Sequence, residues 1–133
     1  MTKVLVVDDD RTMVSLLTTL LGLEGYDVVE VLPRDGMLET ARQENPELVF
    51  MDVFLTGADG IELLRQLKDS PDLAHIPVVM TSGMDVSDRC LAEGAEAFLL
   101  KPYNPDQLIE ILRKSMGEAP QSRRARKVSR QDQ

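Results

Sequence analysis

The stretch that most constrains this chain is residues 48–52, with the sequence LVFMD, an apolar run that ends in one aspartate. The run is short, does not alternate between apolar and polar residues, and lies between Asn45-Pro46 and Gly57. These features predict a strand buried on both faces, as in a parallel sheet. Asp52 then falls at its carboxyl end, the edge at which open α/β sheets place their ligands. A strand-end aspartate can also simply cap a loop or helix, so the other strand ends must decide its role.

Strand-like and helix-like patterns alternate along the chain about five times. Short apolar or β-branched runs predict the other strands at 3–7, 26–31, 77–82 and 97–101. Apolar residues at helical spacing predict five helices. One follows Asp10, one surrounds Ala41, one follows Asp59, one spans 85–93 and the last begins at Pro105. Residues 53–58 are expected to form a loop, and Asp10 and Asp59 to be N-caps. The alternation predicts an α/β fold in which helices cover both faces of a parallel sheet.

Composition narrows the class of protein. The 133 residues suit one domain, and a hydrophobic content of 43% with 29% charged residues is ordinary for a soluble globular protein. No apolar run is long enough to span a membrane, and the N-terminal apolar stretch is too short for a signal peptide. The single Cys90 excludes an internal disulfide. We therefore expect a cytoplasmic protein.

The net charge of −8 is unevenly distributed. Residues 118–133 contain five basic and two acidic side chains, a net of +3, so the other 117 residues carry −11. Apolar periodicity stops after Met116-Gly117, which predicts a folded domain over 1–117 and a basic flexible tail or linker over 118–133. The domain should repel nucleic acid, whereas the tail could attract an acidic partner.

The predicted strand ends bring reactive groups to one edge of the sheet. Asp8 and Asp9 end the first strand, Asp52 the third, Ser82 the fourth and Lys101 the fifth. Three carboxylates at one place repel one another unless a cation joins them. An all-oxygen set favours a hard divalent ion, and Mg²⁺ prefers few carboxylates plus a phosphate. With a lysine and a hydroxyl nearby, the pattern predicts phosphoryl transfer to a carboxylate.

These residues also carry a family resemblance. The chain resembles the receiver domain of two-component response regulators, in particular the chemotaxis-type single-domain receivers, over residues 2 to about 116. The resemblance implies a flavodoxin-like, doubly wound sheet with strand order 2-1-3-4-5. The matching segments are Val6 to Asp9, the run ending in Asp52, Asp59-Gly60, Pro77 to Gly83, Gly94-Ala95 and Lys101-Pro102-Tyr103.

The resemblance assigns a role to each of these residues. It implies that Asp52 accepts a phosphoryl group from a histidine kinase or phosphotransfer protein. It implies that Mg²⁺ is held by Asp8, Asp9, Asp52 and the backbone carbonyl of Phe54.

It further implies that Lys101, Ser82 and Gly83 contact the phosphoryl group. Thr81 is the alternative switch hydroxyl. Phe98 is either a rotating switch aromatic or an ordinary core residue, and the Lys101–Pro102 peptide bond is expected to be cis.

Three departures from the family pattern stand out. Thr56 occupies a position where proline is common, so we expect that loop to be less rigid. Phe54 and Met84, at positions that often influence phosphoryl lifetime, are both apolar. The segment from Ser82 to Gly94 is about one helical turn short, which leaves the output surface unassigned.

We therefore expect a phosphorylation-dependent switch that signals by protein–protein contact with an unknown output protein, as a monomer or weak phosphorylation-dependent dimer. Its enzymatic activity would be limited to Mg²⁺-dependent self-phosphorylation from a donor and self-dephosphorylation. One alternative is the receiver portion of a longer regulator. Another is a phosphatase resembling haloacid dehalogenases, with Asp8 as nucleophile and Asp10 as acid/base. The phosphatase alternative is disfavoured because the motifs of that family run in the order hydroxyl, lysine and acidic motif. Here Asp52 precedes Ser82 and Lys101, and no acidic strand end follows Lys101.

Overall fold

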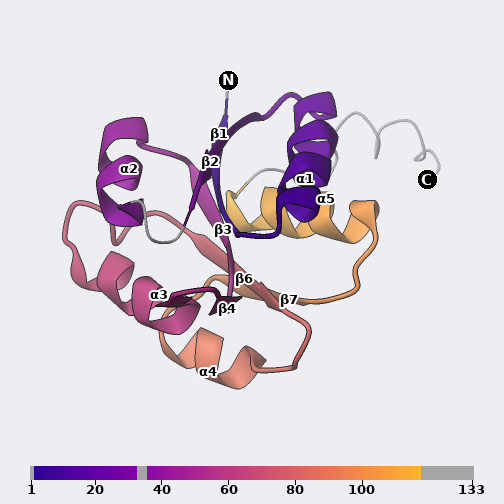
Figure 1. The fold of residues 1–133 in the computed structure, drawn as a ribbon. Coiled ribbons are helices and arrows are strands. Elements are labelled where there is room, and N and C mark those ends of the chain that lie inside the picture. Colours follow the sequence, from indigo (N-terminus) through magenta and orange to yellow (C-terminus); the bar gives the residue numbers. More distant parts are fainter. Residues whose placement is uncertain (1, 33–35, 118–133) are drawn as a thin grey trace.

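The computed structural model describes residues 2–32 and 36–117 (Figure 1). Five parallel strands form one sheet in the order β2-β1-β3-β6-β7. This order equals 2-1-3-4-5 for the strands of that sheet, so the predicted flavodoxin-like topology is confirmed. The strands are β1 (Lys3–Val7), β2 (Asp27–Val31), β3 (Leu48–Asp52), β6 (Val78–Ser82) and β7 (Ala97–Leu100).

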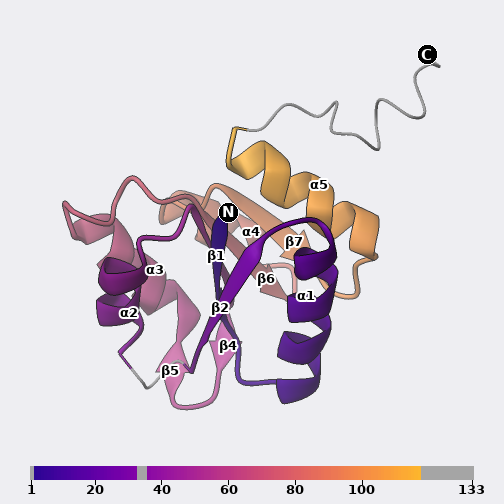
Figure 2. The same cartoon turned by 90° about the horizontal axis from the view of Figure 1, so that it is seen from above.

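Helices cover both faces of the sheet, as Figures 1 and 2 show. One apolar cluster joins one face of the sheet to α1 (Arg11–Leu23) and α5 (Pro105–Ser115). A second cluster joins the other face to α2 (Met37–Glu44), α3 (Gly60–Asp69) and α4 (Ser87–Ala92). Residues of β3 alternate between the two clusters, with Phe50 in the first and Met51 in the second. Both faces of β3 are therefore buried, which is why its sequence is an unbroken apolar run.

The start of each of three helices is fixed by a side chain that accepts a hydrogen bond from a backbone N–H group. Asp10 accepts from the N–H of Met13 at the start of α1, and Asp59 accepts from Ile61 at the start of α3, so both predicted N-caps are confirmed. At α5, Asn104 and Gln107 form a reciprocal capping box. These caps fix where each helix leaves the carboxyl edge of the sheet.

The expected loop over 53–58 is instead a β-hairpin, in which β4 (Phe54–Leu55) pairs antiparallel with β5 (Ala58–Asp59). Thr56 and Gly57 form its turn, and Gly57 has a φ of +77°. A non-glycine residue would be strained in that conformation, so glycine allows the tight reversal. The hairpin could not be predicted from the sequence, because strands of two residues are too short to show an alternating pattern.

The predicted basic tail, residues 118–133, lies outside the described residues. Within the described ranges, no helix is both long and apolar enough to cross a membrane.

Candidate functional site at the carboxyl edge of the sheet

An ion pair joins the central strand to the end of the last strand. The Lys101 Nζ donates to Asp52 Oδ2 at 2.7 Å and lies 4.0 Å from Asp8 Oδ2. Asp52 ends β3, Asp8 follows β1 and Lys101 follows β7, so parallel pairing alone brings the three to one edge. Asp52 is only 9% exposed and Asp8 only 5% exposed. The site thus holds two nearly buried carboxylates and one ammonium group.

Burial makes the charge on Asp8 costly. Burial raises the pKa of the Asp8 carboxyl, and the negative charge of the nearby Asp52 raises that pKa further. The N–H of Asp10, which donates to Asp8 Oδ1 at 2.9 Å, and the Lys101 charge act in the opposite direction. One lysine is thus shared between two carboxylates, a surplus of negative charge that a divalent cation would relieve. The oxygen donors present here fit Mg²⁺ in kind.

Asp9 contacts the β-hairpin that follows β3. Its Oδ2 accepts from the backbone N–H of Thr56 at 2.6 Å. On the same hairpin, the N–H of Phe54 donates to Asp52 Oδ1 at 3.1 Å. In the part of the chain that the structure describes, no three His, Cys, Asp or Glu side chains are grouped so as to hold a metal ion. The predicted ligands Asp8 and Asp52 are therefore brought together, and Asp9 is not.

The two candidate hydroxyls at the end of β6 make different contacts. Thr81 Oγ1 donates to the carbonyl of Leu99 in the neighbouring strand at 2.6 Å. Ser82 Oγ accepts from the N–H of Met84 at 3.0 Å, which leaves its own proton available to donate, and the residue is fully buried. Gly83 follows directly and is exposed. The contacts favour Ser82 over Thr81 as a donor toward the site.

Two other expectations concern β7 and the turn after it. Phe98 is partly buried and packs against the apolar cluster on the side of α3 and α4. The Lys101–Pro102 peptide bond is cis, as the resemblance implied.

A close approach of backbones fixes the hairpin against the strand end. The N–H of Gly60, the first residue of α3, donates to the carbonyl of Val53 at 2.9 Å. A Cβ at position 60 would overlap the carbonyl oxygen of Asp52 and the backbone of Val53. Only glycine therefore lets α3 begin directly beside the candidate phosphoacceptor.

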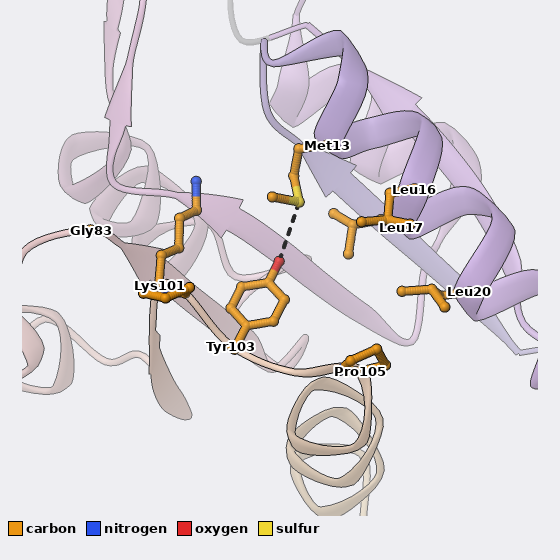
Figure 3. A pocket seen from close by; sticks show the side chains of 9 residues that line it. Met13, Leu16, Leu17, Leu20, Gly83, Lys101, Tyr103 and Pro105 are labelled. Carbon is orange, nitrogen blue, oxygen red and sulfur yellow. Dashed lines mark hydrogen bonds between the residues drawn. The ribbon is translucent and has the colours of Figure 1, made fainter.

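Sequence reasoning missed an apolar groove that opens beside the site (Figure 3). The groove has a volume of about 450 Å³ and lies between α1 and the segment that follows β7. Gly83 and Lys101 line it as well, so it is continuous with the site. The signal in the sequence was that residues 12–23 contain no charged side chain. The remaining lining residues are Met13, Leu16, Leu17, Leu20, Pro102, Tyr103 and Pro105.

Tyr103 forms one wall of this groove. Its hydroxyl donates to the Met13 sulfur at 3.7 Å, drawn as a dashed line in Figure 3. Its ring meets Phe50 edge-on, with centroids 6.3 Å apart and planes at 76°. Burial, together with the charges of Asp8 and Asp52, raises the pKa of Tyr103 to about 12. The phenol is therefore a neutral donor between the groove and the acidic pair.

Comparison with known proteins agrees with this arrangement. Residues 4–113 match the model of the response regulator receiver domain. The polar-differentiation response regulator DivK of Brucella ovis is 31% identical over 123 residues, which is 90% of this chain and 100% of that protein. A putative response regulator from Chloroflexus aurantiacus superposes with a TM-score of 0.82 at 27% identity, covering 88% of this chain and 98% of the other.

The chemotaxis response regulator CheY4 of Vibrio cholerae superposes with a TM-score of 0.79 at 25% identity, covering 86% of this chain and 98% of that one. The family model spans both acidic strand ends and the lysine after β7. This chain therefore belongs to the family of response regulator receiver domains, the receivers of two-component signal transduction.

Proposed function

We propose that Asp52 accepts a phosphoryl group from the phosphohistidine of a histidine kinase or phosphotransfer protein. In this step a carboxylate oxygen of Asp52 forms a bond to phosphorus while the bond from phosphorus to the imidazole nitrogen breaks. The imidazole keeps the electron pair and takes up a proton. The observation that carries the proposal is the 2.7 Å ion pair between Asp52 and Lys101 at a nearly buried strand end. Lys101 is placed to stabilise charge on the transferring group.

The carboxylates on the β1 side support an Mg²⁺ requirement. Asp8, Asp9, Asp52 and the backbone carbonyl of Phe54 are the residues that would hold the ion. When bound, Mg²⁺ would neutralise negative charge on the carboxylates and on the transferring phosphoryl group. The raised pKa of Asp8 supports this assignment, because it reports the cost of an unneutralised charge there.

Ser82 and Phe98 are the proposed readout of the phosphorylated state. The Ser82 hydroxyl, with the N–H of Gly83, would move toward a phosphoryl oxygen on Asp52. That movement would pull on the N–H of Met84, to which Ser82 Oγ is bonded, and so on the segment before α4. Phe98, partly buried under α4, could then change its packing. The outcome would be a changed surface for an output protein.

The apolar groove is proposed to receive the protein that donates the phosphoryl group. The donor must bring its histidine to Asp52, and the groove begins at Lys101 on the rim of that site. Leu16 is 51% exposed on α1 although it is apolar. Such a surface fits the apolar face of a helix on the donor protein.

The test of the phosphoacceptor uses Mg²⁺ and a small phosphodonor such as acetyl phosphate. The expected result is one phosphoryl group per chain on Asp52, seen by intact mass and by peptide mapping, and no label in Asp52→Asn. Label retained by Asp52→Asn and lost in Asp8→Asn would instead support the phosphatase-like chemistry. A phosphotransfer screen against candidate kinases would then identify the donor.

A further inference from the structure

The turn of the β-hairpin contacts Asp9, a proposed metal ligand. Asp9 Oδ2 accepts from the N–H of Thr56 at 2.6 Å, joining two residues that lie 47 positions apart (Figure 2 shows the hairpin beside the turn from β1 to α1). A hydrogen bond from an N–H to a carboxylate is charge-assisted and about twice as strong as a neutral one. The contact therefore restrains both the carboxylate and the hairpin.

The other two carboxylates of the site are engaged differently. Asp52 pairs with Lys101, and Asp8 lies 4.0 Å from the same ammonium. Among the described residues, no three acidic side chains are close enough together to hold an ion. A cation held between Asp8 and Asp52 would draw the Asp9 carboxylate toward them and away from the Thr56 N–H.

We infer that the backbone amide of Thr56 is a latch that competes with Mg²⁺ for Asp9. The latch lowers the affinity for Mg²⁺ and fastens the hairpin when the metal is absent. This inference rests on the proposed metal role of Asp9. It depends on an N–H at position 56, which proline would lack. Thr56, which stands where the family commonly has proline, thus acts through its backbone N–H.

The latch couples metal binding to the hairpin in both directions. If the bond to Thr56 weakens the binding of Mg²⁺, then Mg²⁺ weakens the bond to Thr56 by the same factor. The same hairpin carries Phe54, whose N–H donates to Asp52 Oδ1 and whose side chain is 56% exposed. Metal loading would therefore release the turn at Thr56, while the Phe54 carbonyl, a proposed ligand of the ion, would keep the base of the hairpin beside Asp52.

The geometry of the turn allows the Thr56 N–H to be removed by a proline substitution without disturbing the backbone. Thr56 is not among the residues with positive φ, and Gly57 at +77° has the angle of the second central residue of a type II turn. Proline is common at the first central position of such turns. Leu55, the residue before it, lies in a strand, which is the conformation that a following proline favours. Thr56→Pro should therefore fold while removing the N–H.

The experiment measures Mg²⁺ binding to the full 133-residue chain by titration calorimetry at constant ionic strength. The variants are Thr56→Pro, Thr56→Ala as the matched control that keeps the N–H, and Asp9→Ala. In the parent, the amide resonance of Thr56 is also followed by ¹H–¹⁵N correlation during the Mg²⁺ titration. This second measurement needs no variant and stays informative if Thr56→Pro fails to fold.

We expect Thr56→Pro to bind Mg²⁺ about tenfold more tightly than the parent, as loss of a charge-assisted hydrogen bond implies. Thr56→Ala should bind like the parent, and the Thr56 amide should lose its downfield shift as Mg²⁺ is added. If Mg²⁺ binds with equal affinity to Thr56→Pro and to the parent, and the amide does not shift, the proposed competition by the Thr56 N–H is wrong. The assignment of the metal ligands would not be affected by that result. If Asp9→Ala binds Mg²⁺ as well as the parent, both the metal role of Asp9 and the latch are wrong.

Discussion

Asp52 lies between two surfaces that are built in opposite ways. On the side of β1, Asp8, Asp9 and the hairpin present carboxylates and backbone N–H groups, and charge dominates their energetics. On the side of α1, the groove is lined by aliphatic side chains, and burial of apolar surface dominates. Lys101 belongs to both, because it pairs with Asp52 and also lines the groove. In the proposed function, one side governs the chemistry and the other selects the protein that delivers the phosphoryl group.

The largest effect should come from placing a charge in the groove. Leu16→Glu should lower the rate of phosphotransfer from a protein donor by about tenfold or more, since a buried unpaired charge costs well over 1.4 kcal/mol. Phosphorylation by a small phosphodonor should be unchanged. The measurement is a time course of phosphotransfer with each donor. Ser15→Glu is the matched control, because Ser15 is exposed on the same helix and does not line the groove. Equal loss with both donors would refute the division between the two sides.

A smaller effect is expected at the approach to the phosphoryl group, which Phe54 and Met84 are expected to flank. Phe54 and Met84 are 56% and 64% exposed, and neither side chain can hold a water molecule by a strong hydrogen bond. Hydrolysis needs an aligned water, so the phosphorylated parent should be long-lived and the double variant Phe54→Asn, Met84→Glu should decay several-fold faster. The test follows decay after removal of the donor. A parent that decays as fast as the double variant would show that these side chains do not set the lifetime.

The smallest effect should come from neutralising one charge on the polar side. Asp8→Asn should raise the melting temperature by a few degrees at pH 8 without Mg²⁺, because it removes a buried charge that repels Asp52. The same variant should lose most of the stabilisation by Mg²⁺ that the parent shows. Asp88→Asn removes one exposed charge from α4 and serves as the control. A lower melting temperature in Asp8→Asn would mean that Lys101 already compensates both carboxylates.

Local sequence patterns were sufficient for most of the fold. The buried strand β3 was recognisable because both of its faces are covered, and the caps at Asp10 and Asp59 were recognisable because capping acts within three residues. The meeting of Asp8, Asp52 and Lys101 followed from the rule that parallel strands end at one edge. Each of these predictions used either neighbouring residues or the topology.

Features that depend on distant side chains were not recognisable in the same way. The bond from Thr56 to Asp9 arises only when the hairpin folds against the turn after β1. The groove arises only when α1 meets Tyr103, 90 residues after Met13. Neither contact leaves periodicity, and the absence of charge on α1 is also compatible with a fully buried helix. Tertiary packing decides between these possibilities.

The place of β3 in the sheet has a consequence for folding cooperativity. β3 is hydrogen-bonded to β1 on one side and to β6 on the other, and β6 in turn to β7. These four strands end at the groups that surround Asp52, so the site needs segments from Lys3 to Lys101 and cannot form from any one βα unit. Local opening of the edge strand β2 or of α2 would leave it intact, whereas opening of the other edge strand, β7, would withdraw Lys101 from Asp52. Separation of β3 from β6 would destroy both the core and the proposed acceptor. Competence to be phosphorylated should therefore tolerate local fraying at the β2 edge of the sheet but not at the β7 edge.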